Sequence, residues 1–216
     1  MTAPTLAERL GHGPDDVVVI VNCDDLGSSH AANDAVAEAL ADGAATSTTL
    51  MVPCPWSRQA ALDTGPDADV GIHLTLTSEW EGYRWRPVTP APSLRDAEGC
   101  LPRTNDEVWA GADLDEVRTE LRAQVELALG WGLDITHLDS HMGTLQLDER
   151  YCDIYLEVAA EHDLPVRLSG RSTEPLLGFS FRDRADEAAL VAPDHLIVGM
   201  GPSVRDALAS LRPGVT

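Results

Sequence analysis

The sequence predicts an α/β protein with a parallel sheet, and a β/α barrel is favoured over an open doubly wound sheet. Short apolar strands alternate with helical patterns along the chain, and polar residues follow three of the strands. Alternation of this kind implies parallel β-α units joined by right-handed crossovers. In either arrangement the active site is expected at the carboxyl ends of the strands.

The first part of the chain predicts three strands and two helices. The β-branched run Val17–Val21 predicts a strand buried on both faces, and it leads directly into Asp24 and Asp25. The elements that follow are an alanine-rich helix over 31–41, a strand over 45–52, a short helix over 57–62 and a strand over 70–76 that contains His73.

Residues 77–112 are expected to form an irregular loop insertion. Trp80, Tyr83, Trp85 and several prolines occur there without a usable period. Loops of this length in a compact domain are usually binding loops or lids. The aromatic side chains are expected either to plug the base of the loop or to stack on sugar rings, with Trp80 and Trp85 as the substrate-binding candidates.

Regular structure resumes after this insertion. Apolar residues at helical spacing predict a helix over 114–129. The elements expected beyond it are a strand over 135–139, a helix over 151–161, short strands over 166–168 and 195–198, and a helix over 204–211.

The bulk composition limits the classes of function. A chain of 216 residues with 44% hydrophobic residues suits a single domain spanning 1–216. The formal net charge of −21 argues against nucleic acid as a partner. All fifteen basic residues are arginines, which excludes chemistry that needs lysine, such as a Schiff base or a P-loop.

Cysteine usage and hydropathy bear on the compartment. The four cysteines are widely spaced and match neither a zinc knuckle nor a disulfide scaffold, so we expect reduced thiols. No apolar stretch approaches the ~20 residues that cross a bilayer, and the N-terminus lacks the apolar core of a signal peptide. A cytoplasmic protein that does not bind membranes is expected. The sequence does not fix the oligomeric state, and a homodimer is left open.

Polar groups at three separate strand ends predict a metal site. The pair Asp24-Asp25, His73 and the segment Asp139–His141 would together supply one carboxylate and two imidazoles, which suit a divalent ion with open positions for water and substrate. One aspartate would bind the ion, and the free one, Asp24, would accept a proton from bound water. Asp139 is expected to orient a ligand histidine.

Several motifs resemble one known family. The stretch Val19–Gly27 is similar to the N-A-D-D-F-G opening of the YdjC-like (ChbG-type) carbohydrate deacetylases. Later family motifs are matched in order by Thr46–Val52, Val70–Leu74 and Thr136–His141, and Glu116–Gln124 resembles the family's E-L-x-x-Q segment. The resemblance covers roughly residues 17 to 170.

The resemblance implies a distorted TIM-like barrel and an enzyme that deacetylates N-acetylated sugars or oligosaccharides. It implies that Asp25, His73 and His141 hold Mg²⁺ or Zn²⁺, and that Asp24 is the general base. An arginine that the family carries in a later strand matches Arg167, which places that residue in the substrate pocket.

Two departures from the family pattern are visible. A second histidine that commonly follows the D-S-H motif is replaced by Met142-Gly143, which predicts a looser or wetter metal site. The chain also stops at Thr216, before a family His-Pro segment that supplies the general acid. We therefore expect a barrel that is incomplete at the C-terminus, with proton donation from elsewhere, such as His137 or water.

The expected reaction is hydrolysis by metal-activated water with Asp24 as general base and without a covalent intermediate. The absence of a G-x-S-x-G elbow agrees with this expectation. Two alternatives remain open: a metal-dependent hydrolase of another bond, such as a phosphoester or a non-sugar amide, and a non-catalytic protein that binds sugar or metal.

Overall fold

The computed structural model describes residues 4–65, 68–198 and 203–216. Its main sheet has four parallel strands in the order β2-β3-β4-β5. The strands are β2 (Asn22–Leu26), β3 (Ser47–Leu50), β4 (Val70–Leu74) and β5 (Ile135–Ser140). Strands that are consecutive in this series are neighbours in space, and helices connect them. The predicted parallel α/β class is confirmed.

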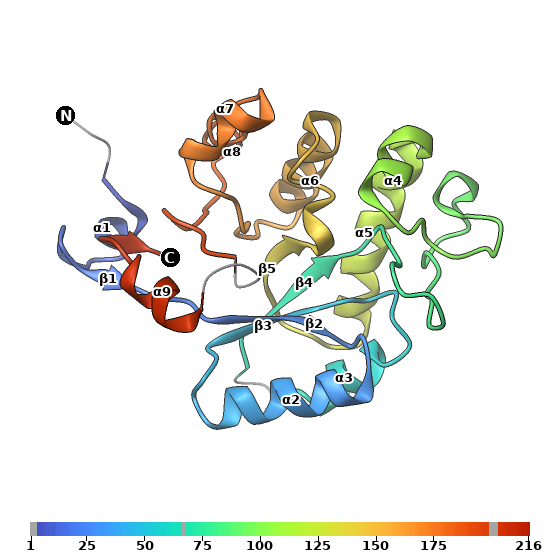
Figure 1. Ribbon diagram of the computed structural model, residues 1–216, viewed down its shortest axis with the longest axis horizontal. Helices are drawn as coiled ribbons and strands as arrows, with labels where there is room; N and C mark the ends of the chain where they lie inside the picture. The colour runs from blue at the N-terminus through green and yellow to red at the C-terminus, as the bar shows by residue number, and fades with distance from the viewer. Residues whose placement is uncertain (1–3, 66–67, 199–202) are drawn as a thin grey trace.

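The helices that follow these strands pack against the sheet. In Figure 1, α2 (His30–Ala41) and α3 (Ser57–Asp63) lie below β2 and β3, whereas α5 (Leu114–Gly130) and α6 (Glu149–Glu161) lie beside β4 and β5. The remaining helical elements are α1 (Leu6–Arg9), η1 (Pro92–Leu94), α4 (Asn105–Gly111), η2 (His141–Gly143), η3 (Arg171–Thr173), α7 (Glu174–Leu177), α8 (Phe181–Glu187) and α9 (Val204–Ala209).

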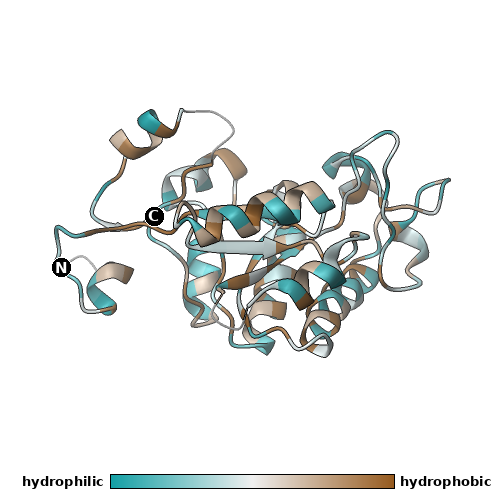
Figure 2. Ribbon diagram, turned by 90° about the horizontal axis from the view of Figure 1, so that it is seen from below, coloured by the Kyte–Doolittle hydropathy of each residue, from teal (hydrophilic) through white to brown (hydrophobic). Residues whose placement is uncertain are grey.

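The core lies between the strands and the helices that cover them. Leu50, Ile72 and Leu138 of the strands are fully buried, as is the apolar face of α5 around Leu121 and Val125. In Figure 2, hydrophobic and hydrophilic stretches alternate along the helices, as expected for helices with one buried face. This packing holds the strands in place, and the positions of the residues at their carboxyl ends are therefore fixed relative to one another.

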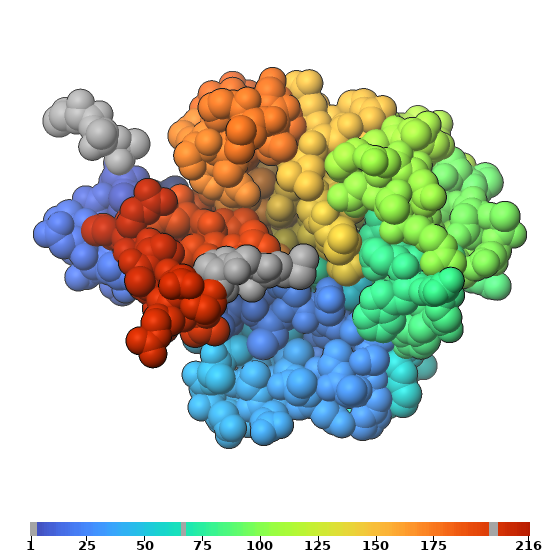
Figure 3. All heavy atoms as spheres, viewed as in Figure 1, coloured from blue at the N-terminus to red at the C-terminus, as the bar shows by residue number. Residues whose placement is uncertain are grey.

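The run Val17–Val21 differs from the prediction. Only Val17–Val18 forms a strand, β1, and it pairs in parallel with β6 (Gly214–Val215) in a separate two-stranded sheet. Val17 and Ile20 are 45% and 51% exposed, so the expected burial on both faces is wrong. The physical reason is that a two-stranded ribbon has too few neighbours to cover both faces of β1. The N-terminal and C-terminal segments meet here, in blue and red in Figures 1 and 3.

Other differences concern short elements. The helix α4 lies inside the insertion that was expected to be irregular, and α7 and α8 have no predicted counterpart. Residues 166–168 and 195–198 are not strands, because Val166 forms only an isolated bridge to Leu138 and His195 donates a single backbone hydrogen bond to Val215. No helix in the described ranges has both the length and the apolar character that crossing a bilayer requires.

Candidate active site

A β-bulge places the two aspartates. Cys23 pairs with Thr48 and Leu26 pairs with Leu50, so that Asp24 and Asp25 together oppose the single residue between those partners. Asp25 has a φ of 66°, in the left-handed region that a bulge residue commonly adopts. Without the bulge the side chains would alternate across the sheet, whereas here both carboxylates reach the surroundings of His73. The aspartates therefore lie within β2 rather than beyond the end of a strand.

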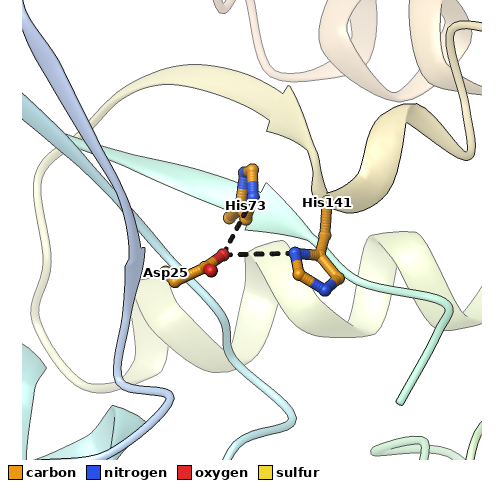
Figure 4. Close-up of side chains that lie close together, drawn as sticks. All are labelled: Asp25, His73 and His141. Atoms are coloured by element: carbon orange, nitrogen blue, oxygen red, sulfur yellow. Dashed lines mark ion pairs between the residues drawn. The ribbon is translucent and has the colours of Figure 1, made fainter. Parts of the chain in front are cut away.

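The structure brings Asp25, His73 and His141 together. Asp25 Oδ1 lies 3.3 Å from His73 Nε2 and 3.2 Å from His141 Nδ1, as Figure 4 shows. The three side chains come from β2, from β4 and from the turn η2 directly after β5. Both histidines are buried, whereas the Asp25 side chain is 44% exposed. The two histidines are thus held in the protein interior, whereas the Asp25 carboxylate is accessible to solvent.

The spacing of these atoms suits a divalent cation. One ligand atom from each of the three residues lies within 4.8 Å of the others. Two ligand atoms that are each about 2.0 to 2.2 Å from a tetrahedral zinc ion are separated by about 3.3 to 3.6 Å. The two Asp25 contacts are close to this separation, and the donor set of two imidazoles and one carboxylate is one that zinc and similar ions accept.

The charges of the cluster are mutually stabilised. Burial lowers the pKa of His73, but the charge of Asp139 and the contacts with Asp25 and Asp24 outweigh it and raise this pKa to about 10. Burial likewise opposes ionisation of Asp25, but the two histidines hold its pKa well below its usual range. The His141 pKa is raised, because contacts with Asp25 and Glu79 outweigh burial. In the metal-free protein at neutral pH, His73 is therefore protonated and lies next to an ionised Asp25.

Asp139 lies on the other side of His73. The two residues face each other in register on β5 and β4, and Asp139 Oδ2 is 2.9 Å from His73 Nδ1. The same oxygen lies 2.8 Å from Arg167 Nη2, and both contacts are charge contacts without the alignment of a good hydrogen bond. Ser140 donates its backbone N–H to the other Asp139 oxygen. Asp139 thus lies behind His73, and its expected role in orienting that histidine stays a prediction.

Asp24 is held by a bidentate ion pair. Arg167 donates to its two oxygens at 2.7 and 2.9 Å, and Asn22 Nδ2 donates to Oδ1 at 2.7 Å. Burial raises the pKa of Asp24, but the hydrogen bond from Arg167 and the charges of His73 and Arg167 leave it lowered. Asp24 is therefore an ionised acceptor next to the cluster of Asp25, His73 and His141. The Arg167 guanidinium pairs with Asp24 and Asp139, and its expected role in substrate binding stays a prediction.

The two tryptophans have different environments. Trp85 is 2% exposed and its Nε1–H donates to the Thr77 carbonyl, so the prediction that it contacts substrate is wrong. Its ring instead packs beneath the loop, which is the other role that we expected for the aromatic side chains. Trp80 is 46% exposed and packs against Trp85 and Tyr83 with ring centroids 5.7 and 5.6 Å away. Trp80 alone of this pair presents a surface to which a sugar could bind.

His137 lies on β5, two residues before Asp139. Its ring packs over Gly71, where an added Cβ would come within 2.6 Å of it. Burial lowers the pKa of His137, despite the charges of Asp69 and Asp139, so the ring is neutral near pH 7. A neutral, tightly packed imidazole is a poor source of protons, and the expected role of His137 as a proton donor stays untested.

Glu79 belongs to the site but was not predicted. Its Oε1 lies 3.0 Å from His141 Nε2, on the side of the ring opposite Asp25. A single glutamate in an irregular loop has no periodic signal, and only the fold of the insertion brings it to His141. The half-buried Asn22, which contacts Asp24, was likewise visible only as part of a polar strand end.

The fold and the cluster define an α/β protein with a candidate metal centre at the carboxyl edge of a parallel sheet. The chain belongs to the YdjC-like protein family, whose model matches residues 18–211. This confirms the resemblance drawn from the motifs.

Individual relatives agree with this assignment. A carbohydrate deacetylase of Thermus thermophilus is 38% identical over 174 residues, which cover 79% of this chain and 61% of the relative. A carbohydrate deacetylase of Brevibacillus brevis is 37% identical over 69% of this chain and 58% of the relative. The chain thus spans about three fifths of the length of these curated relatives.

A solved structure shares the fold. A protein of Enterococcus faecalis described as a "putative cellobiose-phosphate cleavage protein" superimposes with a TM-score of 0.77 and 25% sequence identity. The similarity covers 93% of this chain and 78% of that protein.

Proposed function

We propose that this chain is a divalent-metal-dependent hydrolase that removes acetyl groups from N-acetylated sugars or oligosaccharides. The observation that carries the proposal is the meeting of Asp25, His73 and His141 around one point, with the ionised Asp24 beside them. Asp25, His73 and His141 would hold the ion. When bound, a divalent ion supplies polarisation of a carbonyl and a lowered pKa of coordinated water.

Asp24 is suited to accept a proton during hydrolysis. Its carboxylate is ionised, and Arg167 and Asn22 fix its orientation through three hydrogen bonds. Oδ2 accepts only from Arg167 among the described side chains, so one lone pair on this oxygen is available for a proton. A general base must lie within hydrogen-bond reach of the proton that it removes, and the closeness of the Asp24 carboxylate to His73 supports this role.

The substrate class follows from the relatives and from the loop. The curated relatives are named carbohydrate deacetylases, which supports an acetylated sugar as substrate. Trp80 presents nearly half of its surface directly next to Glu79, and exposed indole rings stack on the apolar faces of sugars. We therefore place one sugar ring against Trp80 while the acetamide reaches the metal cluster.

The four-stranded sheet is proposed to be part of a distorted TIM-like barrel. Its strands are parallel, neighbours in the sheet are neighbours in sequence, and the polar side chains gather at their carboxyl ends. The agreement with the Enterococcus faecalis structure over most of the chain supports the same architecture.

Acetate release from N,N′-diacetylchitobiose, measured with and without a chelator, tests the proposal. We expect release that is lost with the chelator, restored by Zn²⁺ or Mg²⁺ and abolished by Asp25→Asn. Release that persists without metal would reject the metal-dependent mechanism. A panel that includes a phosphomonoester and a non-sugar acetamide distinguishes a hydrolase of another bond, and tight sugar binding without turnover would favour a non-catalytic protein.

A further inference from the structure

The imidazole of His141 lies between two carboxylates. Its Nδ1 faces Asp25 Oδ1 at 3.2 Å, and its Nε2 faces Glu79 Oε1 at 3.0 Å. The His141 and Glu79 side chains are 8% and 21% exposed, so the contact between them is largely shielded from solvent. An ion bound at Asp25 and Nδ1 would leave Nε2 with its proton, and Glu79 is placed to accept that proton in a hydrogen bond.

Glu79 itself is held in a fixed position. Its Oε1 accepts a hydrogen bond from Thr77 Oγ1, and the Thr77 carbonyl accepts from the buried indole of Trp85. Between these residues, Ser78 donates its backbone N–H to the Pro102 carbonyl at 2.7 Å, and its hydroxyl accepts from the Trp85 backbone. The hydrogen bonds at the base of the loop thus fix the position of the Glu79 carboxylate next to His141.

The other histidine of the cluster has the same arrangement. His73 faces Asp25 with Nε2 and a buried carboxylate, Asp139, with Nδ1. Metal-binding histidines in general direct the second ring nitrogen to a carboxylate, a carbonyl or water, which fixes the tautomer and raises the basicity of the ligand. For His73, the carboxylate that faces the second ring nitrogen is Asp139, which lies on the neighbouring strand β5.

We propose that Glu79 is the positioning residue of His141, fixing the ring so that Nδ1 is directed at the metal, and that the loop following β4 thereby sets metal affinity. This inference rests on the proposed metal site of Asp25, His73 and His141. It assigns to the insertion a role in building the centre, in addition to any role in binding substrate.

Titration of the metal-free protein with Zn²⁺ by calorimetry tests the inference, using wild type, Glu79→Ala, Glu79→Gln and Glu81→Gln. Glu81 is exposed in the same loop, so Glu81→Gln removes the same charge without touching the cluster. Loss of a hydrogen-bonded partner behind a metal ligand typically weakens binding about 10 to 100-fold. We expect this increase in Kd for Glu79→Ala, a smaller one for Glu79→Gln, which retains an acceptor oxygen, and a wild-type Kd for Glu81→Gln.

Thermal unfolding of the same metal-free proteins separates positioning from loop stability. A Glu79→Ala protein that binds Zn²⁺ as tightly as wild type would overturn the inference. This holds even if its unfolding midpoint falls, because Glu79 would then stabilise the loop without affecting metal binding. The same weakening in Glu81→Gln would also overturn it, because the effect would then be one of overall charge. A wild-type protein that binds no ion would refute the metal site and the role of Glu79 together, whereas the other outcomes leave the metal site intact.

Discussion

Asp139 and His73 face each other across β5 and β4, with Asp139 Oδ2 2.9 Å from His73 Nδ1. This pairing turns the other ring nitrogen of His73 toward Asp25. Because Asp139 also contacts Arg167, which holds Asp24, a single buried carboxylate links the candidate base to a candidate metal ligand. The two halves of the site are thus parts of one polar network, and substitutions in it can be designed to separate metal binding from proton transfer.

Asp25→Asn is expected to abolish metal binding while preserving the fold. Asparagine has nearly the same shape and tolerates the left-handed conformation of residue 25, but it lacks the charge that holds a divalent ion. We expect Zn²⁺ affinity measured by calorimetry to fall by more than about 100-fold. This loss is larger than the one that typically follows removal of a residue that only hydrogen-bonds to a metal ligand.

The matched control for this substitution is Asp163→Asn. Asp163 is exposed and also has a positive φ, of 53°, so the same change is made in the same backbone conformation on the end of α6. Affinity retained by Asp25→Asn, or lost equally in Asp163→Asn, would contradict the assignment of Asp25.

Asp24→Asn is expected to leave metal binding intact and to slow acetate release. The amide keeps the size of the side chain but is no longer a base, and removing a general base typically lowers kcat about 10² to 10⁴-fold. Calorimetry with Zn²⁺ and the acetate assay on one preparation give the two quantities. Release within a few-fold of wild type would show that another group takes the proton.

Metal binding is expected to release protons and to strengthen as pH rises. His73 has a pKa of about 10 in the metal-free protein, so it is protonated at pH 7 and must lose that proton to bind an ion. The apparent affinity should therefore increase with pH below about 10, by up to about tenfold per pH unit for each proton released. Calorimetry at pH 7 in two buffers of different ionisation enthalpy counts the protons. Heats that do not depend on the buffer would contradict this prediction.

Glu120→Ala is expected to loosen the insertion that carries Glu79. The Glu120 carboxylate is fully buried on α5 and accepts hydrogen bonds from the backbone of Val88 and Thr89, from the Thr89 hydroxyl and from Gln124. Leaving these donors without an acceptor should cost about 2 to 4 kcal/mol in urea unfolding. Glu126→Ala, at an exposed position of the same helix, serves as the control, and equal stability of the two variants would refute the anchoring role.

The predictable part of this protein is the part governed by local pattern. Helix α5 was placed within a residue or two, because its apolar face repeats at helical spacing. The start of the first sheet strand was not predicted correctly: the apolar run Val17–Val21 matched a buried strand, but β2 begins at Asn22, where its register with β3 starts. Strand boundaries depend on partners that are remote in sequence, which a local pattern does not contain.

The candidate site divides in the same way. Asp25, His73 and His141 were predicted because each lies within or after a predicted apolar strand, and the structure brings all three together. Glu79 was missed because its contact with His141 depends on the course of the whole insertion. Trp85 was misjudged because the composition of a loop does not show which aromatic ring lies beneath it.

A crystal of the protein grown with Zn²⁺, measured above and below the zinc absorption edge, tests the central claim most directly. We expect one strong anomalous peak about 2.0 to 2.2 Å from a carboxylate oxygen of Asp25, from His73 Nε2 and from His141 Nδ1. A protein that takes up zinc elsewhere, or that shows no peak between these three side chains, would contradict the proposed metal centre.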